Sequence, residues 1–239
     1  MHSNIKIILV EPQHPGNIGA VARAMKTMGL SRLVLIKPAA FPHKDAYIRA
    51  THAGDILDNC QINDELSEVI EDCHLVIGTS TRDRGGYVPP LTARQSAEKL
   101  VNEANRSTVA LIFGTESTGL TGDDIRKCHY YAYIPTTVNF SSLNLAAAVQ
   151  TFCYEIFQCT LESQADTDSR NENIFPANND LEFFYKRFED LLVQSNFINQ
   201  KHPGVVMIRL KSVFKRARLD QKELNIFQGI ISSLEKNRE

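Results

Sequence analysis

Ser141, Ser142 and Asn144 place two hydroxyls and one amide immediately after an apolar run that ends at Ile134. The small and apolar residues that follow predict a helix over Ser142–Thr160, whose first turn would carry these polar groups. Unpaired backbone N–H groups and partial positive charge collect at the start of a helix. The segment therefore predicts a ligand site on a rigid element.

A second polar segment contains Asn17 and Arg23. Asn17 follows a loop rich in proline and glycine and is placed to cap a helix over Asn17–Met28. Arg23 falls on that helix among small apolar residues, which is an unusual setting for a guanidinium group. One hypothesis is that Arg23 contacts a substrate. The alternative is that Asn17 only caps the helix and Arg23 forms a surface or interface ion pair.

A third segment contains Glu116 between Gly114 and Gly119. Glycine allows a ligand to approach the backbone closely and permits positive φ, and a carboxylate can accept hydrogen bonds from a ribose. The alternative is an ordinary turn between a strand and a helix. The chain contains neither G-x-G-x-x-G nor G-x-x-x-x-G-K-[ST], so dinucleotide-binding and P-loop interpretations lack support.

The order of apolar and periodic segments predicts the element that positions each site. Buried strands are expected at Ile5–Val10, Arg32–Ile36, Leu75–Thr79, Val109–Phe113 and Tyr131–Ile134, and helices at Asn17–Met28, Asp64–Glu71, Ala93–Ala104 and Ser142–Thr160. This alternation indicates an α/β fold, a parallel sheet with helices on both faces. Ligands bind such sheets beyond the carboxyl ends of the strands, where all three polar segments would lie.

The composition changes near Ser163. Residues 163–177 are mostly polar and predict a linker between a domain at 1–162 and a small all-helical domain at 178–239. Helices are expected there at Asn179–Gln194, Val206–Ala217 and Glu223–Glu235.

The overall composition is that of a soluble globular protein. The 239 residues are 43% hydrophobic and 23% charged, with a net charge of −2, so bulk charge does not indicate nucleic acid. The five cysteines form no C-x-x-C pair, which favours reduced core cysteines and no metal site. Since neither a signal peptide nor an apolar run of membrane-spanning length is present, we expect a cytoplasmic protein without membrane contact.

Local clusters of cations could still bind RNA. Arg82 and Arg84 follow one predicted strand, and no acidic residue occurs between positions 201 and 218. The cations predicted to contact RNA are Arg82, Arg84, Lys211, Lys215, Arg216 and Arg218. The alternative for the last four is a solvated helical face.

Together the three polar segments closely resemble the SpoU/TrmH family of SPOUT RNA methyltransferases. That family has an N-x-G-x-x-x-R motif, an F-G-x-E-x-x-G-L motif and an I-P … S-L-N motif. They match Asn17–Arg23, Phe113–Leu120 and Ile134–Asn144. The resemblance implies an α/β domain with a C-terminal trefoil knot, a homodimer, and S-adenosylmethionine as cofactor.

The resemblance also implies roles for individual residues. The cofactor would be bound by three loops that contain Thr79, Ser80, Thr81, Gly114, Ile134, Ser141, Ser142 and Leu143. Arg23 would activate the target ribose hydroxyl, usually across the dimer, and Asn17, Glu116, Ser142 and Asn144 would position it with the substrate and cofactor. Thr115 departs from some relatives, which have arginine there, so one RNA or cofactor contact would be absent.

Nearly the whole chain is similar to a bacterial subgroup that methylates the 2′-hydroxyl of nucleotide 32, a cytidine or uridine, in the tRNA anticodon loop. The expected partners are therefore tRNA and a second copy of the chain. Three alternatives stay open: methylation at another tRNA or rRNA position, a non-catalytic RNA-binding module on the same fold, and a nicotinamide-dependent oxidoreductase.

Overall fold

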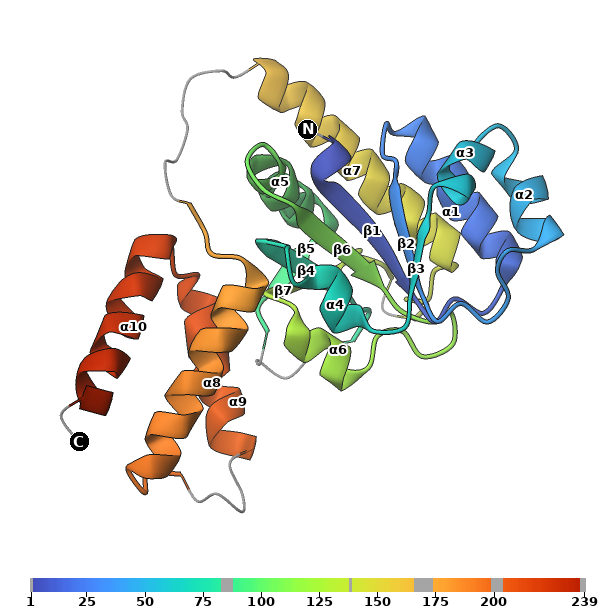
Figure 1. The fold of residues 1–239 in the computed structure, drawn as a ribbon. Helices are drawn as coiled ribbons and strands as arrows, with labels where there is room; N and C mark the ends of the chain where they lie inside the picture. The colour runs from blue at the N-terminus through green and yellow to red at the C-terminus, as the bar shows by residue number, and fades with distance from the viewer. Residues whose placement is uncertain (1, 83–87, 138, 166–173, 199–203, 237–239) are drawn as a thin grey trace.

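The computed structural model describes residues 2–82, 88–137, 139–165, 174–198 and 204–236. Seven parallel strands form one twisted sheet in the order β3-β2-β1-β6-β4-β7-β5 (Figure 1). Their bounds are β1 Ile5–Val10, β2 Arg32–Ile36, β3 Gln61–Asn63, β4 Leu75–Thr79, β5 Pro90–Thr92, β6 Val109–Phe113 and β7 Tyr130–Tyr133. The predicted parallel α/β fold is confirmed, and four of the five predicted strands have the expected bounds.

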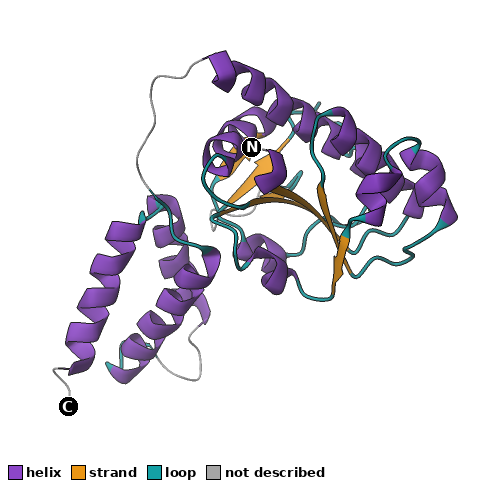
Figure 2. Ribbon diagram, turned by 45° about the horizontal axis from the view of Figure 1, so that its top comes forward, coloured by secondary structure: helices purple, strands orange, loops and turns teal. Residues whose placement is uncertain are grey.

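Helices cover both faces of this sheet (Figure 2). They are α1 Pro15–Thr27, α2 Lys44–Ala50, α3 Gly54–Asp58, α4 Leu66–Ile70, α5 Ala93–Ala104, α6 Gly122–Lys127 and α7 Leu145–Ala165, after a short 3₁₀ turn at His2–Asn4. Alternate β1 residues point to opposite faces: Ile7 joins the core under α1, α2, α3, α5 and α7, whereas Ile8 joins the core under α4 and α6. Burial on both faces explains the continuous apolar runs of the central strands.

Helices α1 and α2 pack unusually closely. A methyl group at the Cα atom of Gly19 would lie 1.9 Å from the carbonyl oxygen of Ala46, so only glycine permits this approach. The prediction omitted α2, α3 and α6 and the two edge strands β3 and β5. Each of these elements is seven residues or shorter, which is too short to display a full hydrophobic period.

The predicted starts of the two helices that carry site residues were wrong by two or three residues. Helix α1 begins at Pro15, because proline at the first position is already fixed in a helical φ, so Asn17 lies inside the first turn. Helix α7 begins at Leu145, so Ser141 and Ser142 lie in the preceding loop. It continues to Ala165, into the segment predicted as a linker.

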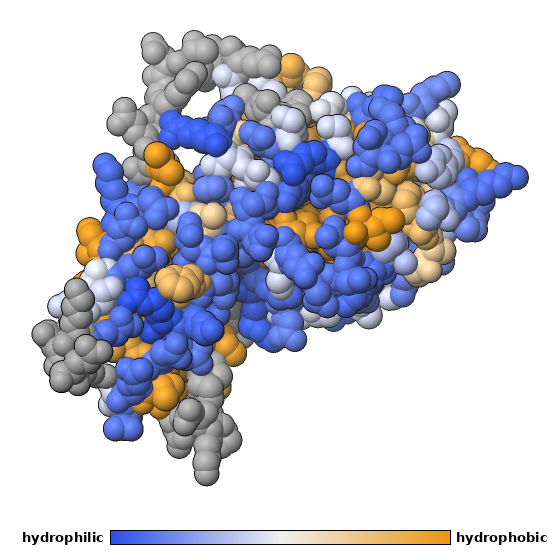
Figure 3. Space-filling view, viewed as in Figure 1, coloured by the Kyte–Doolittle hydropathy of each residue, from blue (hydrophilic) through white to orange (hydrophobic). Residues whose placement is uncertain are grey.

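Three further helices follow: α8 Asn178–Gln194, α9 Gly204–Ala217 and α10 Gln221–Lys236. Aromatic side chains form their core, where the ring of Phe184 packs edge-on against Phe214 with 5.0 Å between centroids. Apolar side chains also reach the surface of this helical part, at the lower left of the space-filling view (Figure 3). Within the described residues, no helix is both long and apolar enough to span a bilayer.

Two cations of α9 and its C-terminal end join the helical part to the sheet. Lys215, 7% exposed, donates from Nζ to the carbonyl oxygens of Arg126 and Cys128, the latter at 2.8 Å. Arg218 donates to the carbonyl oxygen of His74 at 2.8 Å and lies over the ring of Phe175. These carbonyls precede β7 and β4, so the helices are attached near the amino ends of those strands.

Candidate active site

A cavity of about 370 Å³ lies beyond the carboxyl ends of β4, β6 and β7. Its volume is within the range of small-molecule sites, and its position is the expected one for a parallel α/β sheet. All eight residues predicted to bind a cofactor line it: Thr79, Ser80, Thr81, Gly114, Ile134, Ser141, Ser142 and Leu143. The three loops named from sequence therefore converge on one hollow.

Hydrogen bonds connect the three polar segments beside this cavity. The carboxylate of Glu116 accepts from the side-chain amide of Asn17 at 2.9 Å and from the backbone amides of Gln13 and His14 at 2.9 and 3.1 Å. Asn144 donates from Nδ2 to Oδ1 of Asn17 at 3.1 Å. Glu116, Asn17 and Asn144, 127 residues apart at the extremes, thus form one network.

The protonation of Glu116 is set by this network. Burial alone would raise the pKa of this carboxyl, but the hydrogen bonds from Asn17 and from the amides of Gln13 and His14 together lower it. Glu116 is consequently ionised at neutral pH and accepts hydrogen bonds without donating any. This protonation state suits a residue that fixes loops rather than one that donates a proton.

Asn144 holds the network and the helix start at once. Its Oδ1 accepts from the backbone N–H of Ala146 at 2.9 Å and that of Ala147 at 3.4 Å, which caps α7. Asn17 has no such role: the residue before α1 is His14, whose side chain forms no capping bond, and the predicted Asn17 cap is wrong. Its amide is used instead to bridge Glu116 and Asn144.

Gly114 permits the second loop to close. A methyl group at its Cα atom would lie 2.1 Å from the carbonyl carbon of Gly119, and Gly119 itself has φ of +70°. The Thr115 hydroxyl bonds the Thr118 hydroxyl at 2.8 Å across the same turn. Thr115 therefore stabilises the loop conformation.

Arg23 does not line the cavity beyond β4, β6 and β7. It is exposed on α1 and lines a separate hollow of about 540 Å³ between α1, α2 and α7. Of the five predicted catalytic residues, the structure brings Asn17, Glu116, Ser142 and Asn144 together beside the cavity. Arg23 is the one that it places elsewhere.

The six cations predicted to contact RNA differ in exposure. Arg82 is exposed and lines the cavity beyond the carboxyl ends of β4, β6 and β7, and Arg84 lies outside the described residues. Arg216 is exposed, and Lys211 is half-buried beside Glu182 at 3.1 Å. Lys215 and Arg218 instead point inward and donate to backbone carbonyl oxygens. The prediction that these two belong to a surface cluster of cations is therefore wrong.

Sequence reasoning missed several groups that complete the site. The backbone amides of Gln13 and His14 hold Glu116, and no side-chain pattern could have indicated them. Ala148 and Phe152 form an apolar wall of the cavity one and two turns into α7. Their spacing of four residues along a predicted helix was the available indication.

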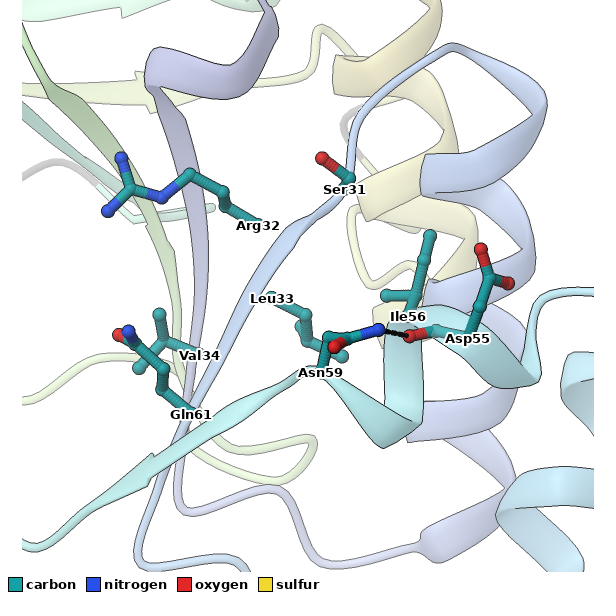
Figure 4. A pocket seen from close by; sticks show the side chains of 8 residues that line it. All are labelled: Ser31, Arg32, Leu33, Val34, Asp55, Ile56, Asn59 and Gln61. Carbon is teal, nitrogen blue, oxygen red and sulfur yellow. Dashed lines mark hydrogen bonds between the residues drawn. The ribbon is translucent and has the colours of Figure 1, made fainter.

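A further hollow, of about 350 Å³, lies near the amino end of β2 (Figure 4). The side-chain amide of Asn59 donates to the carbonyl oxygen of Asp55 at 2.7 Å, and the Asp55 carboxylate is paired with Lys26. Arg32 extends away from both and donates to the carbonyl oxygen of Ser3. This hollow is at the wrong end of the strands for the expected ligand site.

Comparison with known proteins agrees with the geometry. Residues 4–154 match the SpoU rRNA Methylase family, and residues 179–239 match the C-terminal domain of the tRNA methyltransferase TrmJ. The tRNA (cytidine/uridine-2′-O-)-methyltransferase TrmJ of Pectobacterium atrosepticum is 45% identical to this chain and covers 100% of both sequences.

Solved structures show the same arrangement of the chain. TrmJ from Z. mobilis is similar with a TM-score of 0.80 at 28% identity, covering 96% of this chain and 98% of that one. A probable methylase family protein from Haemophilus influenzae gives a TM-score of 0.67 at 39% identity, covering 99% and 98%. A SpoU methyltransferase from Streptomyces viridochromogenes in complex with AdoMet shares the fold, with a TM-score of 0.55 at 20% identity over 67% and 62%.

Proposed function

Because the chain belongs to the SpoU methylase family, we propose that it transfers the methyl group of S-adenosylmethionine to the ribose 2′-hydroxyl of a cytidine or uridine in tRNA. The observation that carries this proposal is the network of Glu116, Asn17 and Asn144, which joins the three family motifs beside one cavity. The full-length similarity to enzymes with this activity supports the substrate class.

The cavity fits the cofactor. Its apolar wall of Leu145, Ala148 and Phe152 suits an adenine ring, and its hydroxyl-bearing loops suit the polar groups of a ribose and an amino acid. The close turn at Gly114 leaves backbone groups, rather than a side chain, facing the hollow. When bound there, S-adenosylmethionine supplies an electrophilic methyl group on a sulfonium. Ser142 and Leu143 would then contact it from the third loop.

Arg23 is proposed to activate the 2′-hydroxyl without acting as a base. A guanidinium has a pKa above about 12, so it does not accept a proton at neutral pH. Its positive charge and hydrogen bonds stabilise the developing oxyanion and orient it toward the methyl carbon. The proton of the hydroxyl that Arg23 orients would pass to solvent as the methyl group is transferred.

The separate position of Arg23 supports a homodimer in which it serves the partner's cofactor cavity. Two inactive variants test this arrangement: Arg23→Ala lacks the arginine, and Gly114→Val fills the cavity loop. If the subunits exchange at random, half of the dimers contain one subunit of each variant, and each of these dimers has one intact site of two. The mixture should therefore recover about a quarter of wild-type activity. No recovery would show that Arg23 acts within its own chain.

The target is proposed to be nucleotide 32 of the anticodon loop. The TrmJ-like helical part supports a tRNA substrate, because a second RNA contact beside the catalytic domain would select overall shape. Arg82 at the cavity and Arg216 on α9 are exposed and suited to phosphate contacts. We therefore propose a catalytic domain at 1–162, a linker at 163–177 and a helical RNA-contacting domain at 178–239.

We also propose that the chain is threaded as the family's trefoil knot. The sheet order supports it, because β7 lies between β4 and β5 although it follows both in sequence. A crystal structure in which residues 134–144 do not pass through the connection between β4 and β5 would contradict the knot.

The decisive experiment maps 2′-O-methyl groups on unmodified tRNA after incubation with the protein and S-adenosylmethionine. We expect one new modification, at nucleotide 32, and none on ribosomal RNA. Arg23→Lys should lose most of the turnover of wild type, because an ammonium cannot reproduce the planar pair of donors. Modification at another position would correct the target. Absence of transfer to any RNA would refute the enzymatic function.

A further inference from the structure

The hollow that contains Arg23 has a second arginine. It is lined by Ala20, Arg23, Ala24 and Thr27 of α1, Ile48 and Arg49 of α2, Thr51, and Gln150 of α7. None of these eight residues is acidic. The lining thus combines two guanidinium groups with hydroxyl and amide groups, which is the composition of an anion site.

Arg49 is held in place rather than extended freely into solvent. A methyl group at the Cα atom of Gly16 would lie 2.7 Å from both Cδ and Nε of Arg49, so the arginine side chain lies against the first turn of α1. It belongs to the last turn of α2, where a cation interacts favourably with the helix dipole. Because α2 is fixed on α1 at Gly19, the guanidinium is positioned before any ligand binds.

Neither arginine has a charged partner among the residues that the structure describes. Asp55, an acidic residue beside α1, is engaged elsewhere, because it binds Lys26 of that helix at 2.7 Å. Asp45, one turn before Arg49, forms no ion pair with it among the described residues, and its backbone N–H donates to Nδ1 of His43 at 3.2 Å. Two like charges that share one hollow repel each other, and an anion between them would relieve that repulsion.

We propose that Arg49 binds a backbone phosphate of the RNA next to the ribose that Arg23 contacts. This inference rests on the proposed function and adds a residue that positions the substrate strand. A guanidinium matches a phosphate with two parallel hydrogen bonds, and phosphate contacts fix the register of a nucleic acid without reading its sequence. Arg49 would therefore hold the strand while Arg23 acts on one nucleotide.

The test measures binding of an unmodified tRNA transcript to the full-length protein at several salt concentrations. Arg49→Ala should raise Kd about tenfold and reduce the slope of log K against log salt by about one. Arg49→Lys should keep the wild-type slope, because it retains the charge. Lys44→Ala removes an exposed cation from the same helix outside the hollow and should change neither quantity.

Two results would overturn the inference. One is an Arg49→Ala variant with wild-type Kd and salt slope. The other is a variant whose sedimentation mass falls, which would mean that Arg49 binds carboxylates of a second copy instead of RNA. The proposed function fails separately: it is refuted if wild-type protein binds tRNA but transfers no methyl group, whatever the Arg49 variants do.

Discussion

Glu116 and Lys215 are two buried or half-buried charges that bridge distant segments, and neither forms an ion pair among the described residues. Glu116 accepts three N–H groups, which outweigh burial and lower its pKa, so its charged form is favoured. Lys215 reaches only two carbonyl oxygens, and burial lowers its pKa to about 8, so its charged form is less favourable in the folded protein than in water, although it still predominates at neutral pH. Hydrogen bonds thus outweigh burial at Glu116 but not at Lys215.

The difference separates the two regions by pH. Glu116 adds stability above the pKa of an unfolded glutamate, and this is lost only as acid protonates it in the folded protein. Lys215 has the same direction of pH dependence at higher pH: between pH 8 and 10.5 the unfolded chain binds more protons than the folded one, so its contribution to stability rises with pH there. The active-site network is therefore constant through the neutral range, while the domain junction changes just above it.

The Glu116→Gln variant should have the largest effect. One carboxylate oxygen becomes an NH₂ group that faces N–H donors from Asn17, Gln13 or His14, which leaves a donor unpaired. We expect kcat/KM for tRNA to fall about 100-fold, roughly 2.7 kcal/mol. Glu98→Gln, on the surface of α5, is the control in the same assay. Near-normal turnover of Glu116→Gln would show that the network does not position the catalytic groups.

Removal of the junction lysine should mainly affect stability. Lys215→Ala leaves the carbonyls of Arg126 and Cys128 without a donor and opens space under α9. The free energy of unfolding should fall by about 2 kcal/mol at pH 7, measured by urea denaturation. Arg216→Ala, its exposed neighbour, should stay within about 0.5 kcal/mol of wild type. Equal values for the two variants would contradict the role of Lys215 in attachment.

The difference in the free energy of unfolding between wild type and Lys215→Ala should also depend on pH, and this is the more specific measurement. Because wild type is relieved of the unfavourable burial of a charge above pH 8, the stability lost in Lys215→Ala should grow between pH 8 and 10.5. The increase is at most about 1.4 kcal/mol per pH unit. A difference that stays flat or shrinks across this window would mean that Lys215 is charged in the folded protein throughout.

Asn144→Asp should give the smallest effect and divide the two roles of Asn144. An aspartate keeps the oxygen that caps α7 but loses the Nδ2 donor to Asn17. We expect stability within about 0.5 kcal/mol of wild type and turnover about fivefold lower. The melting temperature checks the cap, and the methyl-transfer rate checks the network. Normal turnover would confine Asn144 to capping.

The sequence was sufficient for the central sheet and for the convergence of the three loops. Strands such as β1 and β6 are apolar on both faces, and polar residues that follow parallel strands must meet at one edge. Short edge strands such as β3 leave no such pattern. Helix starts were less predictable, because Pro15 and Asn17 are both acceptable near the start of α1 and tertiary contacts decided between them.

Individual side-chain directions were the least predictable feature. Four cations near the end of α9 look alike in sequence, but Lys215 and Arg218 find carbonyls of the sheet domain and Arg216 does not. Which carbonyls lie nearby depends on how the helical part packs, and that is a property of the folded chain. The position of Arg23 outside the cavity likewise depends on tertiary packing, in this case that of α1 against α2 and α7.

The contact between Gly19 and the Ala46 carbonyl makes α1 and α2 a single mechanical unit. Any side chain at position 19 would push the helices apart and shift Arg49 relative to Arg23 without touching either. Under the proposed roles of Arg23 and Arg49, a change of target nucleotide would therefore require both helices to be redesigned together, because only the hydrogen atom at the Cα of Gly19 fits between them.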